Sequence, residues 1–273
     1  MTEELGKRVV TGTVLAAIVS GVIAFGDPIW VTGLAGLAAS GAMAEWTRLS
    51  KNPPSPTGSA LWGVLALVVT ITIAALYRHY PVALSVVALA WVSLLAWVAW
   101  VSVKGSGYSL NPSPGMGLVI VCPALACIPF VHQYFPDGIL FLFALCLLVW
   151  GSDIGAYAVG RKWGQHKLAP SVSPGKTWEG VIGGVVIGTA GTTALIGWGV
   201  VPSRLTLAVL IGIAFCSVVS VLGDLFESMV KRVSGKKDSG SFLPGHGGIL
   251  DRIDSLLAAA PVFSALLLLV YSV

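Results

Sequence analysis

The sequence predicts an all-α, polytopic integral membrane protein with about nine transmembrane helices, the N-terminus in the cytoplasm and the C-terminus outside. Apolar residues make up 56% of the 273 residues, whereas charged residues make up only 10%. The mean hydropathy of +0.88 lies above the range of soluble domains. Apolar runs also recur along the whole chain, and many approach the length of about 20 residues that a membrane span needs.

Nine such runs are separated by links rich in Pro, Gly and Ser, such as "KNPPSPTGS" and "NPSPG", which predict loops. The first run has no small-residue cleavage site and is followed by many similar runs, so it predicts a retained span and not a signal peptide. The spans are expected at Val9–Phe25, Ile29–Trp46, Ala60–Tyr77, Pro81–Val103, Gly115–Val131, Gly138–Gly160, Gly180–Val201, Leu205–Val233 and Ile249–Tyr271.

Basic residues are distributed unevenly over the links of this arrangement. With the N-terminus inside, thirteen Lys and Arg fall on cytoplasmic segments, and only Arg78 and Arg204 fall on outside loops. Arg252, just inside the ninth span, belongs to neither group. Because Lys and Arg accumulate in cytoplasmic loops, this asymmetry predicts the orientation. It also places the link between the eighth and ninth spans in the cytoplasm.

Five acidic residues of the sixth, eighth and ninth predicted spans lie where charge is costly and usually functional. All of them fall near the cytoplasmic ends of their spans, and they are Asp153, Asp224, Glu227, Asp251 and Asp254. On the eighth span, Asp224, Glu227 and Lys231 share one helical face because they are three and four residues apart. On the ninth span, Asp251 and Asp254 are one turn apart. Two facing helices therefore present several carboxylates at one depth.

Carboxylates at this density repel one another unless a cation lies among them. Hard oxygen ligands beside basic residues suit Mg²⁺, and the sequence leaves open whether a second cation binds. The alternative is that the acids and bases only pair with one another at the helix interface, as charged side chains near helix ends do. Some of the basic residues, such as Arg48 and Lys51, are expected to contact the membrane surface.

Two polar segments on the cytoplasmic side are candidates for binding phosphate. In "LPGHGG", Gly247 and Gly248 follow His246 and precede a helix, so their backbone N–H groups can approach an anion closely. His246 has the alternative role of a turn histidine that is hydrogen-bonded by the backbone. In "SVSPGKTWEG", Ser173 and Lys176 supply a hydroxyl and an ammonium group. This segment is not a Walker A motif, because Pro170 occupies the position of the required glycine.

The run from Ser228 to Asp254, S-x-V-K-R-x4-K-D-x-G-x2-L-P-x-H-G-G-I-x-D-R-I-D, resembles the signature of the phosphatidate cytidylyltransferases, also called CDP-diacylglycerol synthases. It covers about a tenth of the chain, and its fixed spacing makes it specific. The upstream "SPGKTWEG" resembles a second polar motif of that family. The resemblance implies a multi-helix enzyme of the inner membrane, often dimeric, that condenses CTP with phosphatidate to give CDP-diacylglycerol and pyrophosphate.

The resemblance also implies roles for the polar residues, with Mg²⁺ as the cofactor and the active site facing the cytoplasm. CTP, phosphatidate and the bilayer are the expected partners, and no nucleic acid is expected. By resemblance and position, the expected metal ligands are Asp224, Asp251, Asp254 and Asp153. The expected catalytic residues are Asp224, Asp251 and Lys231. The expected substrate-binding residues are Ser173, Lys176, Arg232, Lys237, His246, Gly247 and Gly248.

Residues 1–135, with the first five spans, are expected to form a scaffold, and residues 136–273 the catalytic region. Two other functions stay open. One is a related CTP-dependent lipid enzyme, such as a polyprenol or phytol kinase or a CDP-archaeol synthase. The other is an ion-coupled transporter, which also places carboxylates among helices. The run "HGGILDRID" argues against the first, and the density of bases near one membrane face argues against the second.

Overall fold

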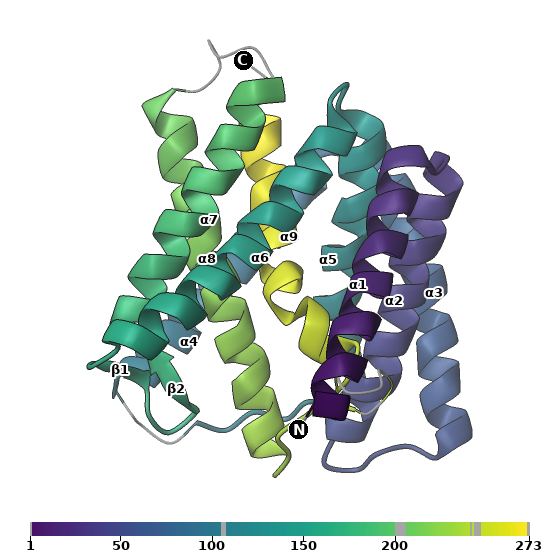
Figure 1. Ribbon diagram of the computed structural model, residues 1–273. Coiled ribbons are helices and arrows are strands. Elements are labelled where there is room, and N and C mark those ends of the chain that lie inside the picture. Colours follow the sequence, from purple (N-terminus) through teal and green to yellow (C-terminus); the bar gives the residue numbers. More distant parts are fainter. Residues whose placement is uncertain (1, 105–107, 200–205, 241, 243–246, 272–273) are drawn as a thin grey trace.

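The computed structural model describes residues 2–104, 108–199, 206–240, 242 and 247–271 (Figure 1). Within these residues the chain forms nine helices and one two-stranded hairpin. The predicted residues His246 and Arg204 lie outside the described part. The elements are α1 (Thr2–Phe25), α2 (Pro28–Leu49), α3 (Pro56–His79), α4 (Val82–Lys104), α5 (Pro114–Tyr134), α6 (Gly138–Trp163), β1 (Lys167–Ala169), β2 (Ser173–Thr177), α7 (Trp178–Gly199), α8 (Leu207–Val233) and α9 (Leu250–Tyr271).

Each of the nine apolar runs in the sequence coincides with one of these helices. Among the described residues, the seven helices from α3 to α9 are long and apolar enough to cross a membrane. The apolar part of α1, Thr11–Phe25, is shorter. The fold is therefore that of a helical integral membrane protein, as the composition predicted.

Several helices begin inside the breaker-rich links. Pro56 and Pro114 stand in the first turns of α3 and α5, where proline fits because the first helical N–H groups have no intrahelical acceptor. The hydroxyls of Ser55 and Ser113 cap these helices by accepting hydrogen bonds from the amides of Gly58 and Met116.

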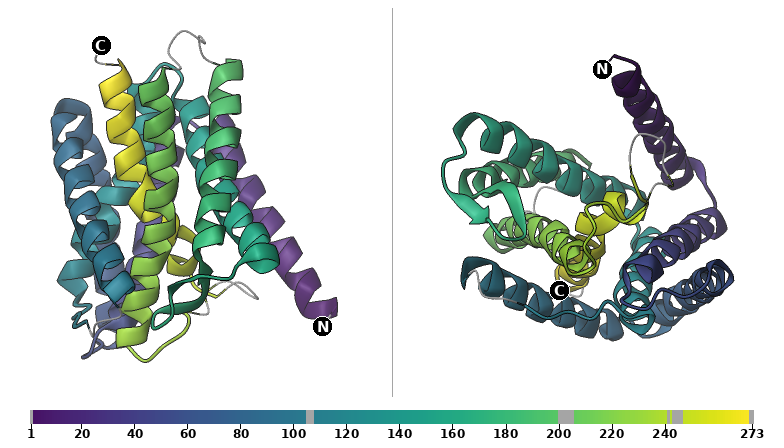
Figure 2. Two further views of the ribbon diagram at one scale, coloured as in Figure 1. Left: turned by 90° about the vertical axis from the view of Figure 1, so that its left-hand side faces the viewer. Right: turned by 90° about the horizontal axis from the view of Figure 1, so that it is seen from below.

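The helices are arranged around α8 and α9 (Figures 1 and 2). The pair α6 and α7 lies on one side, α2, α3 and α5 lie on the other, and α4 packs against α8 and α9. The start of α1 and the end of α9 lie at opposite ends of the bundle. The hairpin and the link between α8 and α9 share the end where α1 begins, which we call the hairpin end. In Figure 1 the axis of α9 turns partway along its length, and this helix contains Pro261, which cannot donate to the helix ladder.

The all-α prediction missed the hairpin. Strands β1 and β2 pair antiparallel, with Lys167 opposite Thr177 and Ala169 opposite Ser173. Glu179 in the first turn of α7 attaches the hairpin to this helix, because its Oε1 lies 2.6 Å from His166 Nδ1. The residue before β1 is thereby held against the start of α7, which directly follows β2.

Aromatic packing fixes the half of α8 nearest the hairpin end. The Phe226 ring lies between Trp46 of α2 and Trp91 of α4, at centroid distances of 6.4 and 6.0 Å. Trp46 Nε1 also donates to the Ser113 carbonyl at 3.0 Å. Since Phe226 precedes Glu227, this contact holds the polar face of α8 in place relative to α2.

Candidate active site

A pocket of about 460 Å³ lies at the hairpin end, between α6, β2, α7 and α8. Asp153 of α6, Ser173 and Lys176 of β2 and Asp224 of α8 contribute its polar lining. Lys176 Nζ lies 2.8 Å from Asp224 Oδ2 and donates to the Val221 carbonyl at 3.1 Å. Residues far apart in the sequence therefore meet here, and the hairpin that the sequence did not predict supplies the ammonium group.

Exposed apolar side chains flank this pocket on the outer faces of α6 and α7. Tyr157 lines the pocket and is 66% exposed. Ile154 and Ile182, which follow lining residues Asp153 and Val181, are exposed as well. The polar pocket therefore borders an apolar surface of the bundle.

Asp254 of α9 adds a third carboxylate to this group. It interacts electrostatically with Asp224, Asp153 and Lys176. One of its oxygens accepts a hydrogen bond from the Ser255 amide at 2.7 Å. We call Asp153, Lys176, Asp224 and Asp254 the pocket group.

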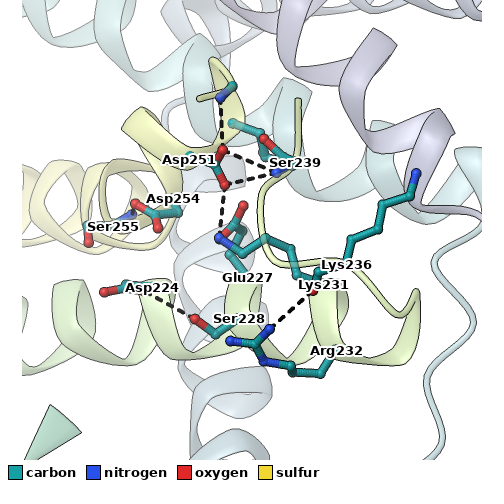
Figure 3. Close-up of polar contacts among 12 residues, drawn as sticks. Asp224, Glu227, Ser228, Lys231, Arg232, Lys236, Ser239, Asp251, Asp254 and Ser255 are labelled. Atoms are coloured by element: carbon teal, nitrogen blue, oxygen red, sulfur yellow. Dashed lines mark hydrogen bonds and ion pairs between the residues drawn. The ribbon is translucent and has the colours of Figure 1, made fainter. Parts of the chain in front are cut away.

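A second charged group lies where α8, α9 and their link meet (Figure 3). Lys231 pairs with Glu227 one turn earlier, and its Nζ lies 2.9 Å from Asp251 Oδ1. The Glu227 and Asp251 side chains are only 3% and 7% exposed. We call Glu227, Lys231, Ser239 and Asp251 the loop group.

Main-chain amides complete the surroundings of Asp251. The Ser239 amide lies 3.1 Å from both carboxylate oxygens, and the Gly248 amide donates to Oδ2 at 2.8 Å. Gly247 turns the chain with φ of +79°, a conformation that favours glycine. The Gly248 amide, predicted to face a phosphate, thus binds Asp251 in this structure, and the substrate-binding roles of Gly247 and Gly248 stay predictions.

The two remaining basic residues that were expected to bind substrate, Arg232 and Lys237, lie at the end of α8 and on the link that follows it. Arg232 donates through Nε to the Val172 carbonyl at 3.2 Å and through Nη1 to the Lys236 carbonyl at 3.3 Å. The Tyr108 hydroxyl donates a hydrogen bond to the Met229 carbonyl at 3.5 Å. Burial raises the pKa of the Tyr108 phenol, and the positive charge of nearby Arg232 opposes this rise. Lys237 is exposed on the link. Arg232 therefore connects α8 to the hairpin, whereas the substrate-binding role of Lys237 stays a prediction.

The sequence grouped the acids at one depth, and the structure separates them into these two groups. Asp224, Asp153 and Asp254 share the pocket group, whereas Asp251 belongs to the loop group with Glu227. Lysine ammonium groups stand at the centre of both, as the ion-pair alternative predicted. Among the described residues, no three acidic, histidine or cysteine side chains are arranged to surround a single metal ion.

The chemistry of the pocket group nevertheless fits a hard cation. Three carboxylates gather around Lys176, and Arg252 interacts with one of them, Asp153. Arg161 also lines the pocket, so basic as well as acidic side chains surround it. The Asp224 side chain is 34% exposed, and within the described part of the chain its Oδ1 accepts one long hydrogen bond, 3.4 Å from Ser228 Oγ. Oxygen ligands of this kind suit Mg²⁺.

Sequence reasoning missed one acidic residue near the site, Glu45 of α2. Glu45 is only 4% exposed, and its carboxylate contacts the Ser239 hydroxyl and the first amides of α9. The available signal was a single carboxylate inside the apolar run Ile29–Trp46. Its partners lie about 200 residues later in the chain.

The fold and the site together define an integral membrane protein with a charged pocket at one end of an apolar helical bundle. The chain belongs to the cytidylyltransferase family, whose family model matches residues 6–270. This confirms the resemblance that the polar motifs indicated.

Three relatives illustrate the extent of this similarity. The phosphatidate cytidylyltransferase of Pseudomonas aeruginosa is 41% identical over 270 residues, which cover 96% of this chain and 97% of the relative. That of Brucella suis is 38% identical over 274 residues, covering 94% and 90%. That of Bacillus subtilis is 46% identical over 132 residues, about half of each chain. The similarity to the first two extends over the first five helices as well as the polar motifs.

Proposed function

We propose that this protein transfers the cytidylyl group of CTP to phosphatidate, forming CDP-diacylglycerol and pyrophosphate. The observation that carries the proposal is the pocket in which Lys176 pairs with Asp224. The chain belongs to the cytidylyltransferase family, and the relatives that it resembles are named phosphatidate cytidylyltransferases. A phosphate oxygen of phosphatidate attacks the α-phosphorus of CTP. The bond from this phosphorus to the oxygen that bridges to the β-phosphate breaks, and pyrophosphate leaves.

Two polyanions must meet for this reaction, so its barrier is largely electrostatic. We assign Lys176, Lys231, Arg232 and Lys237 to the phosphates of the two substrates. Lys176 is in position to exchange its pairing with Asp224 for a phosphate oxygen in the pocket. No general base is required, because a phosphate monoester already carries about 1.5 to 2 negative charges near neutral pH.

Mg²⁺ is the proposed cofactor, and a second cation is part of the same proposal. Asp224, Asp254 and Asp153 would hold it from the pocket group, and Asp251 would contribute from the loop group once Lys231 turns to a phosphate. When bound, the ion supplies positive charge to the nucleotide phosphates and to the leaving pyrophosphate. Ser173 and the segment with His246, Gly247 and Gly248 are proposed to hydrogen-bond substrate phosphates.

A labelled-nucleotide assay tests the reaction. Membranes or purified protein with phosphatidate should convert CTP labelled at the α-phosphate into labelled lipid, and EDTA should abolish this incorporation. CTP labelled at the γ-phosphate should leave the lipid unlabelled. Incorporation of the γ-label alone would indicate a lipid kinase instead, and no incorporation from either nucleotide would favour a transporter.

We further propose nine membrane spans with the hairpin end in the cytoplasm, at the inner membrane of the cell, and a homodimer as the assembly. Residues 1–135 act as the scaffold of the catalytic region 136–273. The thirteen basic residues on the predicted inside segments support this orientation. The diacylglycerol chains of the substrate remain in the bilayer while the headgroup enters the pocket.

Cysteine labelling tests the orientation. The four native cysteines lie within helices, and three of them are buried, so they give little background. Cysteine at Asn52 or Lys236, on links at the hairpin end, should react with a membrane-impermeant maleimide only from the cytoplasmic side. Cysteine at Pro136, on the link at the opposite end, should react only from outside. Equal accessibility of positions 236 and 136 would contradict the nine-span arrangement.

A further inference from the structure

Glu45 connects the scaffold helix α2 to the start of α9. Its Oε1 accepts a hydrogen bond from the Ile249 amide at 3.0 Å, and its Oε2 accepts from the Leu250 amide at 2.8 Å. Leu250 is the first residue of α9 and Ile249 directly precedes it, so neither N–H group has an acceptor within the helix. A carboxylate at a helix N-terminus is also favoured by the helix dipole. Glu45 therefore caps a helix that begins about 200 residues later in the chain.

Ser239 links this carboxylate to Asp251. Its hydroxyl donates to Glu45 Oε2 at 3.0 Å, while its amide contacts both oxygens of Asp251. The amides at the start of α9 are divided in the same way, because Gly248 donates to Asp251 and the next two residues donate to Glu45. Two carboxylates thus hold one loop from opposite sides.

Close packing leaves the Glu45 carboxylate little room to move. A Cβ atom on Gly240 would lie 2.6 Å from Glu45 Oε1, and a Cβ atom on Gly248 would collide with Glu45 Oε2 and Ser239 Oγ. The neighbouring Trp46 is buried against Phe226 of α8. Glu45 is therefore held both by its own helix and by the loop that it contacts.

We propose that Glu45 is a positioning residue that orients Asp251 and Lys231 through Ser239 and the first amides of α9. In this role Glu45 acts through other residues and not by binding CTP or phosphatidate itself. Its effect passes to Asp251 through Ser239 and then to Lys231, whose Nζ lies 2.9 Å from Asp251 Oδ1. This inference deepens the proposed function and rests on it, since Asp251 and Lys231 are the residues assigned to the reaction.

Glu45→Gln is an informative substitution because it keeps the size of the side chain. Each oxygen of Glu45 accepts at least one main-chain N–H. The NH₂ group of glutamine must therefore face a main-chain donor, whichever way the amide turns. We expect the loop to shift and the turnover number to fall about tenfold to a hundredfold, the size of effect that small misplacements of catalytic groups produce.

Ser239→Ala removes only the hydroxyl contact and keeps the amide that binds Asp251. Its turnover number should fall less than that of Glu45→Gln. The double variant should be no worse than Glu45→Gln alone, because both changes break the same connection. Ser239→Ala also tests the proposal if Glu45→Gln fails to fold.

Tyr77→Phe is the matched control. Tyr77 is a buried scaffold residue whose hydroxyl donates to the Pro123 carbonyl at 3.3 Å, and it therefore also joins two helices. This variant should lose some thermal stability but retain the turnover number of the wild type. The Glu45→Gln variant should lose turnover even at temperatures where all of the protein is folded.

Hydrogen exchange gives a readout that does not depend on activity. In nanodiscs, peptides covering residues 236–252 should exchange faster in Glu45→Gln and Ser239→Ala than in the wild type or Tyr77→Phe. Unchanged exchange in this segment, or a wild-type turnover number in folded Glu45→Gln, would overturn the positioning role. An inactive wild type would instead refute the proposed function, and the exchange comparison would still decide whether Glu45 orders the loop.

Discussion

Asp224→Asn is expected to reduce CDP-diacylglycerol formation by roughly a hundredfold or more, because a cation at a transferring phosphate contributes several kcal/mol of charge stabilisation. Asparagine keeps the size of the side chain but removes the charge that a hard cation needs. Since the Asp224 side chain is 34% exposed, loss of its pair with Lys176 should cost about 1 kcal/mol of folding stability or less.

Asp251→Asn should behave differently, although it also removes a proposed metal ligand. The Asp251 side chain is 7% exposed and contacts Lys231 and two main-chain amides. Breaking a buried ion pair of this kind costs about 3 to 5 kcal/mol. This variant should therefore lose thermal stability as well as activity, with or without Mg²⁺.

Thermal unfolding measured with and without Mg²⁺, alongside labelled CTP incorporation, separates the two effects. A ligand that binds only the folded state of a protein raises the stability of the protein by mass action. The wild type should gain stability from Mg²⁺, and Asp224→Asn should fold but lose that gain. An Asp224→Asn protein that retains substantial Mg²⁺-dependent transfer would contradict the assignment of Asp224, even though the chain belongs to the family.

Lys231→Met is expected to produce the largest loss of stability among the basic residues. Methionine keeps much of the volume but leaves two buried carboxylates, Glu227 and Asp251, without their shared ammonium group. Removing one partner of a buried pair typically costs about 3 to 5 kcal/mol. The free energy of unfolding, measured by denaturant titration in detergent, should fall by an amount of this order.

Two companion variants test the reason for this loss. Glu227→Gln combined with Lys231→Met should recover part of the stability, because one of the unpaired carboxylates is then neutral. Lys176→Met should cost about 1 kcal/mol or less, since its partner Asp224 is partly exposed. Its activity should still fall roughly tenfold to a hundredfold, as expected for one charge-assisted phosphate contact. Equal destabilisation by Lys176→Met and Lys231→Met would contradict the burial argument.

The helices could be predicted from the sequence because apolar runs and their proline-rich boundaries are local signals. Pro56 and Pro114 mark helix starts in both the pattern and the structure. The hairpin could not be predicted in this way. Strand β2 has the sequence "SPGKT", which lacks the alternation of apolar and polar residues that identifies a strand. The hairpin is also held by the contact between His166 and Glu179, which a local sequence pattern does not show.

The candidate site was predictable in its residue types but not in its pairings. The spacing of Asp224, Glu227 and Lys231 correctly placed these residues on neighbouring turns of one helix. It could not show that Lys231 binds Asp251 or that Lys176 reaches Asp224, because these contacts join separate segments. Glu45 was missed for the same reason. Its partners are a distant hydroxyl and main-chain amides, and amides carry no sequence signal.

The apolar surface beside the pocket has a consequence for how the enzyme samples its lipid substrate. Ile154, Tyr157 and Ile182 present apolar side chains next to the pocket group. If the headgroup enters from this side, the substrate arrives by lateral diffusion within the leaflet and never crosses bulk water. Its effective concentration is then the mole fraction of phosphatidate in the surface. Adding inert lipid or detergent at constant total phosphatidate should slow the reaction by surface dilution, whereas CTP should follow ordinary bulk saturation.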